Sequence, residues 1–433
     1  MSVETGFIGV GILLVLLFLR VPVALALIGV SFGGISSLIG TKAAFGVLSN
    51  TPYDFAASWT MSAVPMFLLM GFVAFHADLT GGLFDAAKAA LRKIPGALAI
   101  ASVFACSAFA AVCGSSLATA ASMGRIAIPE MIRAGYSPSI AAGSIAAGGT
   151  IGALIPPSIL MIVYGIFAET SITQVFLGGV SIGIITALSY AAIILILAWT
   201  RPDLIPRETV VGHTLSAGEA AAKIWPVLVL ILLVFGGLFA GFFTATEAGA
   251  IGAAGAVICA LILGKLTRKV IKDALLETLV ATASLLIIAI GAAMFTRFLG
   301  ITGLSSFLSG FVGSADIGYV QLMLVIVLIY LLLGMFMEPF GALLVTLPVF
   351  LPILESEGLS LVWFGVLVVK LLEIGMITPP VGLNVFVIRN VAGDHVTTRQ
   401  VFKGVAPFFA ADLVVVALIV AVPAIVLALP SLM

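Results

Sequence analysis

The sequence predicts an all-α polytopic membrane protein that contains two inverted repeats, each with a re-entrant helical hairpin and a broken transmembrane helix. Of its 433 residues, 62% are hydrophobic and only 9% are charged, whereas a soluble domain of this length carries about a quarter charged residues. Apolar runs follow one another along almost the whole chain, so no soluble domain of useful size is left over. The length permits about ten to twelve spans of roughly 20 residues each.

Composition also excludes several classes of protein. Nineteen Lys and Arg balance nineteen Asp and Glu, and no basic patch is large enough to neutralise the phosphates of a nucleic acid. Cys106, Cys113 and Cys259 all lie in apolar runs without a CxxC pair, so neither a disulfide framework nor a cysteine metal site is expected. The first apolar run is interrupted by Arg20 and Pro22 and lacks a cleavage site, which favours a retained span over a removed signal peptide.

The order of the apolar runs divides the chain into five parts. These are N-terminal scaffold spans in residues 1–60, a first repeat in 61–168, central scaffold spans in 169–274, a second repeat in 275–388 and a C-terminal span in 389–433. Short apolar runs come in pairs near 98–132 and near 318–354, and a few residues rich in Gly, Ser, Pro or charge join the members of each pair. Two short helices with a polar tip predict a hairpin that enters and leaves the membrane on one side.

A long apolar run that is broken near its middle follows each hairpin, at 138–168 and at 361–388. Pro156-Pro157 interrupts the first run and Pro379-Pro380 the second, and each pair removes two amide donors and clashes with the preceding helical turn. Such a break frees carbonyl groups on one half-helix and N–H groups on the other. Within a bilayer this backbone is tolerated only where it lines a cavity or contacts protein.

The two regions are repeats of one another, and their charges indicate opposite orientations. An offset of 223 residues pairs Gly152 with Gly375 and superimposes the two Pro-Pro breaks. Basic residues in the loops 201–223 and 265–273 predict that both loops are cytoplasmic. The first hairpin then opens from the cytoplasm, whereas the second, whose flanks carry only acidic charges, opens from outside.

Proteins with inverted repeats and broken helices hold ligands near the membrane midplane. Carbonyl groups freed at the two breaks suit a hard cation such as sodium. The hydroxyls of Ser115, Ser116 and Thr119, at the tip of the first hairpin, suit a carboxylate, because a helix N-terminus favours negative charge.

Carboxylates within apolar runs are functional candidates, because they are costly in a membrane. Glu338, in the second hairpin tip, is expected to serve the substrate site, whereas Glu247 fits the first turn of a helix better. Glu373 fits either an ion site or an ion pair with Lys370. Asn384, on the half-helix after the second break, fits substrate binding and packing equally well.

Four motifs, in this order, resemble the large membrane subunit (the M-type, DctM-like subunit) of tripartite ATP-independent periplasmic (TRAP) transporters. The motifs are CGSSLATAASMGRIAIPEMIRAGY, GGTIGALIPPS, FTATEAGA and GMITPPVGLNVFV, and the resemblance covers essentially the whole chain. It departs from the family at Cys113, where a serine is usual.

The resemblance implies sodium-coupled uptake of a small organic acid, such as a C4-dicarboxylate or sialic acid, by an elevator mechanism in a bacterial inner membrane. It further implies two separate partners, a small four-span membrane subunit and a periplasmic solute-binding protein.

The resemblance also implies two or more coupling sodium ions and no organic cofactor, with one ion between each hairpin tip and its partner break. Residues that match the first site are Gly114, Ser115, Gly152, Ile155 and Pro157. Residues that match the second site are Gly334, Gly375, Thr378 and Pro380.

One alternative is a sodium/divalent-anion symporter of similar inverted-hairpin architecture that works without a binding protein. An intramembrane enzyme is disfavoured, because the sequence contains no HExxH motif, no metal-ligand spacing and no nucleophile–base pair. An ATP-driven permease is disfavoured as well, since the chain has no P-loop.

Overall fold

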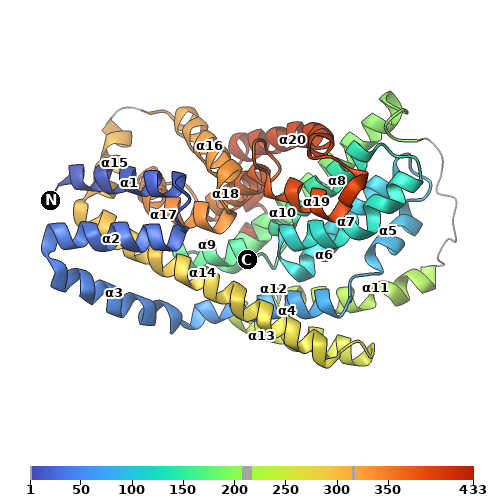
Figure 1. Cartoon of the computed structure of the whole chain (residues 1–433), viewed down its shortest axis with the longest axis horizontal. Helices are drawn as coiled ribbons and strands as arrows, with labels where there is room; N and C mark the ends of the chain where they lie inside the picture. Colours follow the sequence, from blue (N-terminus) through green and yellow to red (C-terminus); the bar gives the residue numbers. More distant parts are fainter. Residues whose placement is uncertain (1, 207–216, 315–316) are drawn as a thin grey trace.

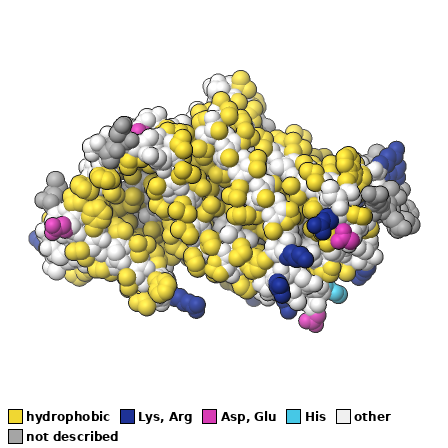
Figure 2. Space-filling model, turned by 90° about the horizontal axis from the view of Figure 1, so that it is seen from above, with side chains coloured by type: hydrophobic (Ala, Val, Ile, Leu, Met, Phe, Trp, Pro, Cys, Tyr) yellow, Lys and Arg dark blue, Asp and Glu magenta, His cyan; other side chains and the backbone are white. Residues whose placement is uncertain are grey.

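The computed structural model describes residues 2–206, 217–314 and 317–433, and the described part is built from helices (Figure 1). Part of the predicted cytoplasmic loop 201–223 lies outside the described residues. Among those described, eight helices are long and apolar enough to cross a membrane, which agrees with a polytopic protein. Figure 2 shows a broad hydrophobic surface, with most of the visible Lys and Arg side chains gathered near one end of the molecule.

The helices of the two halves of the chain are as follows. The first half contains α1 (Val3–Phe18), α2 (Val23–Ile39), α3 (Thr41–Ala56), α4 (Ala63–His76), α5 (Leu83–Leu91), α6 (Ala97–Cys113), α7 (Ser116–Arg133), α8 (Pro138–Thr150), α9 (Ile159–Phe167) and α10 (Ile172–Thr200). The second half contains α11 (Ala217–Ile231), α12 (Gly237–Phe239), α13 (Ala245–Ile262), α14 (Arg268–Thr302), α15 (Leu304–Ser314), α16 (Tyr319–Phe336), α17 (Pro339–Ser356), α18 (Leu361–Gly375), α19 (Leu383–Ala392), α20 (Thr398–Ala421) and α21 (Ala424–Leu427).

The predicted hairpins and broken helices are confirmed. The first hairpin is α6 and α7, and the second is α16 and α17; they enter from opposite ends of the molecule and point toward its middle (Figure 1). The first broken helix is α8 and α9, joined by a single 3₁₀ turn and the Pro-Pro step, and the second is α18 and α19. Both Pro-Pro peptide bonds are cis. The repeats are therefore inverted, as the charge pattern predicted.

The repeat extends over nearly the whole chain, further than the sequence pattern predicted. The offset of 223 residues carries α7 onto α17, and it also brings α2 onto α13, α5 onto α15 and α10 onto α20 within a few residues at each end. Each half thus supplies the same succession of outer spans, short connecting helix, hairpin, broken helix and closing span. The short helices α5 and α15 and the helix α3 were not predicted from the sequence.

The closing spans pack across the boundary between the repeats. Helix α20 of the second half lies along α8 of the first half, and α10 of the first half packs on α18 of the second. The contact between α8 and α20 is backbone on backbone. A Cβ atom added to Gly143 would lie 2.3 Å from the carbonyl carbon of Gly404, and one added to Gly404 would lie 1.8 Å from the oxygen of Ser139. Small residues allow this close approach of membrane helices.

The outer spans form a second group of packed helices. Helix α4 packs on α13 and α14, and α14 also packs along α2. Helix α13 begins with a capping box, in which Thr244 Oγ1 accepts a hydrogen bond from the Glu247 N–H and the Glu247 carboxylate accepts one from the Thr244 N–H. This confirms the prediction that Glu247 is a first-turn acid.

The contact between α8 and α20 predicts a specific sensitivity to added volume. We expect Gly404→Ala to destabilise the protein by about 1–3 kcal/mol, because the new methyl group meets rigid backbone rather than a movable side chain. Thermal unfolding of the purified protein in detergent measures the effect. Gly300→Ala on α14 is the matched control, since a Cβ atom there meets nothing within 4 Å; equal melting temperatures for the two variants would contradict the close packing.

Candidate functional site

The tips of the two hairpins meet at one cavity of about 260 Å³ near the middle of the molecule. One side of the cavity is formed by the tips, through residues such as Ser115, Ser116 and Glu338, and by Glu373 of the second broken helix. The other side is formed by α4 and α14, through Gly71 and several neighbours. The cavity thus lies between the hairpin units and the outer spans.

The first hairpin tip presses against the first break. Gly114 ends α6 in the left-handed conformation with φ of +62°, and a Cβ atom at this position would lie 2.2 Å from the carbonyl oxygen of Pro157. From the other side, a Cβ atom on Gly152 would lie 3.2 Å from the backbone nitrogen of Ser116. Glycine at both positions lets the tip reach the carbonyl groups that the break frees.

The second hairpin makes the equivalent contact with the second break. A Cβ atom on Gly375, at the end of α18, would lie 2.4 Å from the carbonyl carbon of Gly334. The chain turns sharply after Gly375, where Thr378 Oγ1 donates to the oxygen of Ile374 at 2.6 Å. Each predicted pairing of a tip with its own break is therefore a direct contact, and in both cases a glycine lies on each side of it.

Serine hydroxyls orient the first tip. Ser115 caps α7, and its Oγ accepts a hydrogen bond from the N–H of Ala118 at 3.4 Å. Thr119 is buried, and its hydroxyl donates to the oxygen of Ser115 at 2.7 Å. Ser116 reaches across to the other repeat, where its Oγ donates to Glu373 Oε2 at 2.5 Å. This last contact links the first hairpin tip directly to the second broken helix.

Glu338 occupies the corresponding place in the second tip. It caps α17, and its carboxylate accepts a hydrogen bond from the N–H of Gly341 at 3.2 Å. Among the described residues, two charged side chains line the cavity, Glu338 and Glu373, and both are acidic. An anion in this cavity would therefore need N–H donors from the helix ends, or cations that enter with it, to offset the two carboxylates.

Gly114 of the first tip also lines the cavity, whereas the other predicted site residues do not. Asn384 is fully buried on α19, where its Nδ2 donates to the oxygen of Ala146 at 3.4 Å and its Oδ1 has no hydrogen-bond partner among the described residues. Thr119 lies behind the first tip. Of the remaining predicted sodium-ligand residues, Gly334 lies near the end of α16 in the second hairpin, and the others belong to the two breaks; these are Gly152, Ile155, Pro157, Gly375, Thr378 and Pro380.

The sequence left two alternatives for Glu373, and the structure distinguishes them. Lys370 does not pair with Glu373: its Nζ lies 2.5 Å from the carboxylate of Asp412 on α20, and both of these side chains are fully buried. Glu373 instead accepts the hydrogen bond from Ser116 and lines the cavity. Asp412 was not predicted, although a lone acid deep within the apolar part of the predicted C-terminal span 389–433 was a signal that could have identified it.

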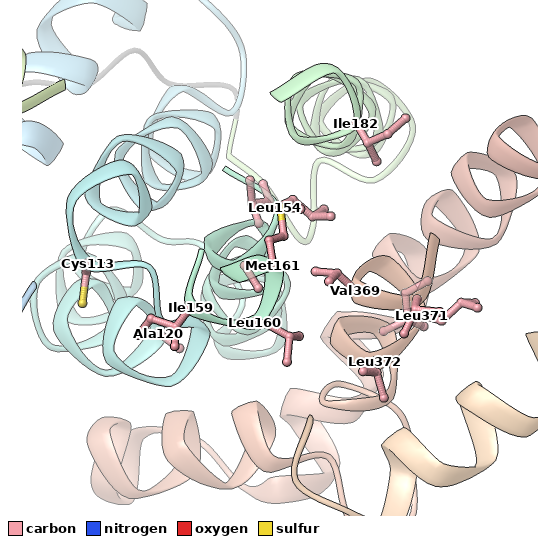
Figure 3. Packing of buried hydrophobic residues seen from close by; sticks show 14 of the residues in the cluster. Cys113, Ala120, Leu154, Ile159, Leu160, Met161, Ile182, Val369, Leu371 and Leu372 are labelled. Atoms are coloured by element: carbon pink, nitrogen blue, oxygen red, sulfur yellow. The ribbon is translucent and has the colours of Figure 1, made fainter. Parts of the chain in front are cut away.

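Apolar packing joins the two units around this polar centre. Figure 3 shows Leu160 and Met161 of α9 next to Val369 and Leu372 of α18, with Ile182 of α10 nearby. All five side chains are buried. Residues from both repeats thus belong to one continuous core behind the hairpin tips.

A chain of apolar spans in which two inverted hairpins close a central cavity against two broken helices is a multi-pass membrane transporter. Within that class, the chain belongs to the family described as the DctM component of tripartite ATP-independent periplasmic transporters, whose family model matches residues 10–425. Proteins of this family are transporter permeases and not enzymes.

Individual relatives support the same assignment. The chain is 34% identical, over 92% of both chains, to the C4-dicarboxylate TRAP transporter large permease protein DctM of Pseudomonas aeruginosa. It is 31% identical to the sialic acid large permease SiaM of Vibrio cholerae, over 94% of this chain and 97% of the other. It is 30% identical to the ectoine/5-hydroxyectoine large permease UehC of Ruegeria pomeroyi, over 92% of both.

Solved structures with the same fold are more distant in sequence. The YdaH transporter of Alcanivorax borkumensis and MtrF of Neisseria gonorrhoeae each match with a TM-score of 0.62 and 16% identity. Both comparisons cover 89% of this chain, together with 89% of YdaH and 85% of MtrF. They establish the likeness of fold alone.

The contact between Ser116 and Glu373 generates a testable prediction. We expect Ser116→Ala to lower stability by about 1–3 kcal/mol, because it leaves the buried Glu373 carboxyl group without its side-chain donor. Thermal unfolding in detergent measures the loss. Ser107→Ala is the matched control, since the Ser107 hydroxyl is also buried but bonds only to Val103 O of its own helix. An equal loss of thermal stability in the two variants would show that the contact between the repeats contributes nothing specific.

Proposed function

We propose that this chain is the large permease of a sodium-coupled system that imports a small organic acid across a bacterial inner membrane. The acid is a C4-dicarboxylate, sialic acid or a similar carboxylate, and a periplasmic binding protein delivers it. The observation that carries the proposal is the convergence of both hairpin tips, each in contact with its own break, on one central cavity.

The substrate carboxylate binds at the first hairpin tip in this proposal. The N-terminus of α7 and the hydroxyl of Ser115 supply hydrogen-bond donors, and a helix N-terminus favours an anion. Ser116 lines the site beside them, with its hydroxyl proton directed to Glu373. The N-terminus of α17, capped by Glu338, faces the same cavity from the second repeat. The family includes relatives named for C4-dicarboxylate and for sialic acid, which supports a carboxylate.

Coupling sodium ions bind behind the tips, at the two breaks. Sodium is a hard cation, and the breaks offer backbone carbonyl oxygens that the helices do not use. The first ion takes oxygens near Gly114 and Pro157, and the second takes oxygens near Gly334 and Gly375, where each tip touches its break. The two acidic side chains of the cavity provide a physical reason for cations to accompany an anionic substrate.

Transport proceeds by an elevator motion in this proposal, in which one rigid body carries the site across the membrane. The sequence placed residues 174–200 with the stationary scaffold. However, α10 packs on α18 and α6, and α20 packs on α8 and α10. We therefore infer that both closing spans travel with the hairpins and broken helices, rather than staying with the scaffold. The scaffold then consists of α1–α4 and α11–α14, and the connecting helices α5 and α15 join it to the moving body.

Two further proteins complete the system. The small membrane subunit and the binding protein are proposed from the family, which is tripartite by its description. A relative from Oleidesulfovibrio alaskensis, named isethionate TRAP transporter permease protein DctMQ, is longer than this chain, which spans 64% of it at 31% identity. A longer relative of that name supports a small subunit that works together with the large permease.

Reconstitution tests the proposal directly. Proteoliposomes that contain this chain and the small subunit of the same system, with its binding protein outside, should accumulate radiolabelled succinate or N-acetylneuraminate when an inward sodium gradient is imposed. The same uptake should not depend on ATP. Uptake of equal rate with potassium in place of sodium, at fixed pH and voltage, would refute the coupling.

Omission of single components separates this proposal from its nearest alternative. Vesicles that lack either the binding protein or the small subunit should show uptake near background. Saturable, sodium-dependent uptake by this chain alone would instead identify it as a stand-alone sodium/divalent-anion symporter.

A further inference from the structure

Four buried polar side chains, one from each of four helices, form a connected cluster that we term the inter-repeat cluster. Lys370 Nζ of α18 donates to Asp412 Oδ1 of α20 at 2.5 Å. The hydroxyl of Tyr190 on α10 donates to the other oxygen of the same carboxylate at 2.7 Å. That hydroxyl also lies 3.3 Å from Oγ1 of Thr150 on α8.

The cluster is sealed from solvent and from lipid. Lys370, Asp412, Thr150 and Tyr190 are all 0% exposed. The Lys370 ammonium group also lies 5.8 Å from the centre of the Tyr190 ring, where a cation is attracted by the aromatic face. Burial of two opposite charges is costly, and close geometry with additional hydrogen bonds is needed to offset that cost. Here both carboxylate oxygens of Asp412 have a donor.

The position of the cluster relates it to both breaks. Thr150 ends α8, two residues before Gly152, and Lys370 lies on α18 five residues before Gly375. The helices α8 and α18 are equivalent under the 223-residue offset, and so are α10 and α20. The cluster therefore ties together the first half of each broken helix through the two closing spans.

An ion pair of this kind adds little net stability, because well-packed apolar side chains in its place are often as stable. Its distinctive property is geometric. A charge-assisted contact with short donor–acceptor distances cannot slide by one helical turn without leaving a buried charge unpaired, whereas apolar contacts can. The cluster is suited to fix the axial register of α8 against α18.

We propose that Tyr190, Lys370 and Asp412 are positioning residues that hold the two breaks in one relative register, so that cation binding at one break depends on the other. This rests on the sodium coupling proposed above. None of the three side chains lines the cavity, and they act on the cation sites through the positions of α8 and α18.

Tyr190→Phe provides a mild test, because it removes only the hydroxyl that joins α10 to Asp412 and Thr150. Tyr330→Phe is the matched control: Tyr330 is also fully buried, but its hydroxyl accepts a hydrogen bond from Thr346 within the second hairpin and does not join the repeats. For each purified protein, the shift in melting temperature is measured against sodium concentration, with potassium holding ionic strength constant. This measurement requires no substrate, and sodium-driven uptake by the full complex is measured in parallel.

We expect the sodium concentration for half-maximal stabilisation to rise about fivefold or more in Tyr190→Phe, which is the lower end of typical coupling between sites. It should stay unchanged in Tyr330→Phe, although both variants lose some thermal stability. The double variant Lys370→Met/Asp412→Leu, which removes both charges at once, should show the same weakened response. A lower melting temperature without a change in the sodium response, in Tyr190→Phe and in the double variant, would overturn the positioning role.

The wild-type protein separates failure of this inference from failure of the proposed function. A wild type whose stability and uptake do not respond to sodium at all overturns both. If the wild type responds to sodium and the melting temperature of Tyr190→Phe shows the same dependence on sodium concentration, only the role of the inter-repeat cluster is overturned.

Discussion

The rest of this structure depends on how the protein satisfies the backbone groups that two breaks free inside a membrane. Unpaired amide and carbonyl groups cost several kcal/mol each in hydrocarbon, so each break must meet protein or a bound ligand. Both breaks meet a hairpin tip, and the contact is close enough to require glycine on each side, as with Gly334 and Gly375. The tips, their charges and the cavity between them follow from that requirement, because the chain must bring polar backbone from both ends of the molecule to its middle.

A second consequence is that neither repeat is complete alone. The closing span of each half packs on the broken helix of the other, and Ser116 of the first half bonds to Glu373 of the second. The buried pair of Lys370 and Asp412 adds a charged contact at the same boundary. Separation of the halves would expose these polar groups together, so a motion that keeps them joined and slides the whole body against α4 and α14 costs less than one that parts them.

Much of this could be predicted from the sequence, because the determining residues are glycines, prolines and short apolar runs with direct backbone consequences. The hairpins, the breaks and their inversion were predicted from these residues, and the pairing of each tip with its break was implied by the family resemblance. The full extent of the repeat was not, since α2 and α13 or α10 and α20 are equivalent in position but are related by general apolar character rather than by particular residues. Asn384 and Asp412 show a further limit of prediction from sequence. The contacts among buried polar side chains depend on how the helices cross, and the periodicity of the sequence does not specify those crossings.

Cross-linking tests the proposal that the hairpins, broken helices and closing spans of both halves form one body, which moves against the outer spans. In a background without the other native cysteines, one link would join α8 to α20 through Ser139→Cys and Lys403→Cys, and a second would join α4 to the first hairpin tip through Leu68→Cys and the native Cys113. Sodium-driven uptake by the reconstituted complex is then measured before and after cross-linking. We expect the first link to leave uptake largely intact and the second to arrest it, because only the second joins the moving body to the outer spans. Arrest by the first link, with continued uptake under the second, would show that the repeats separate during transport and would refute the single moving body.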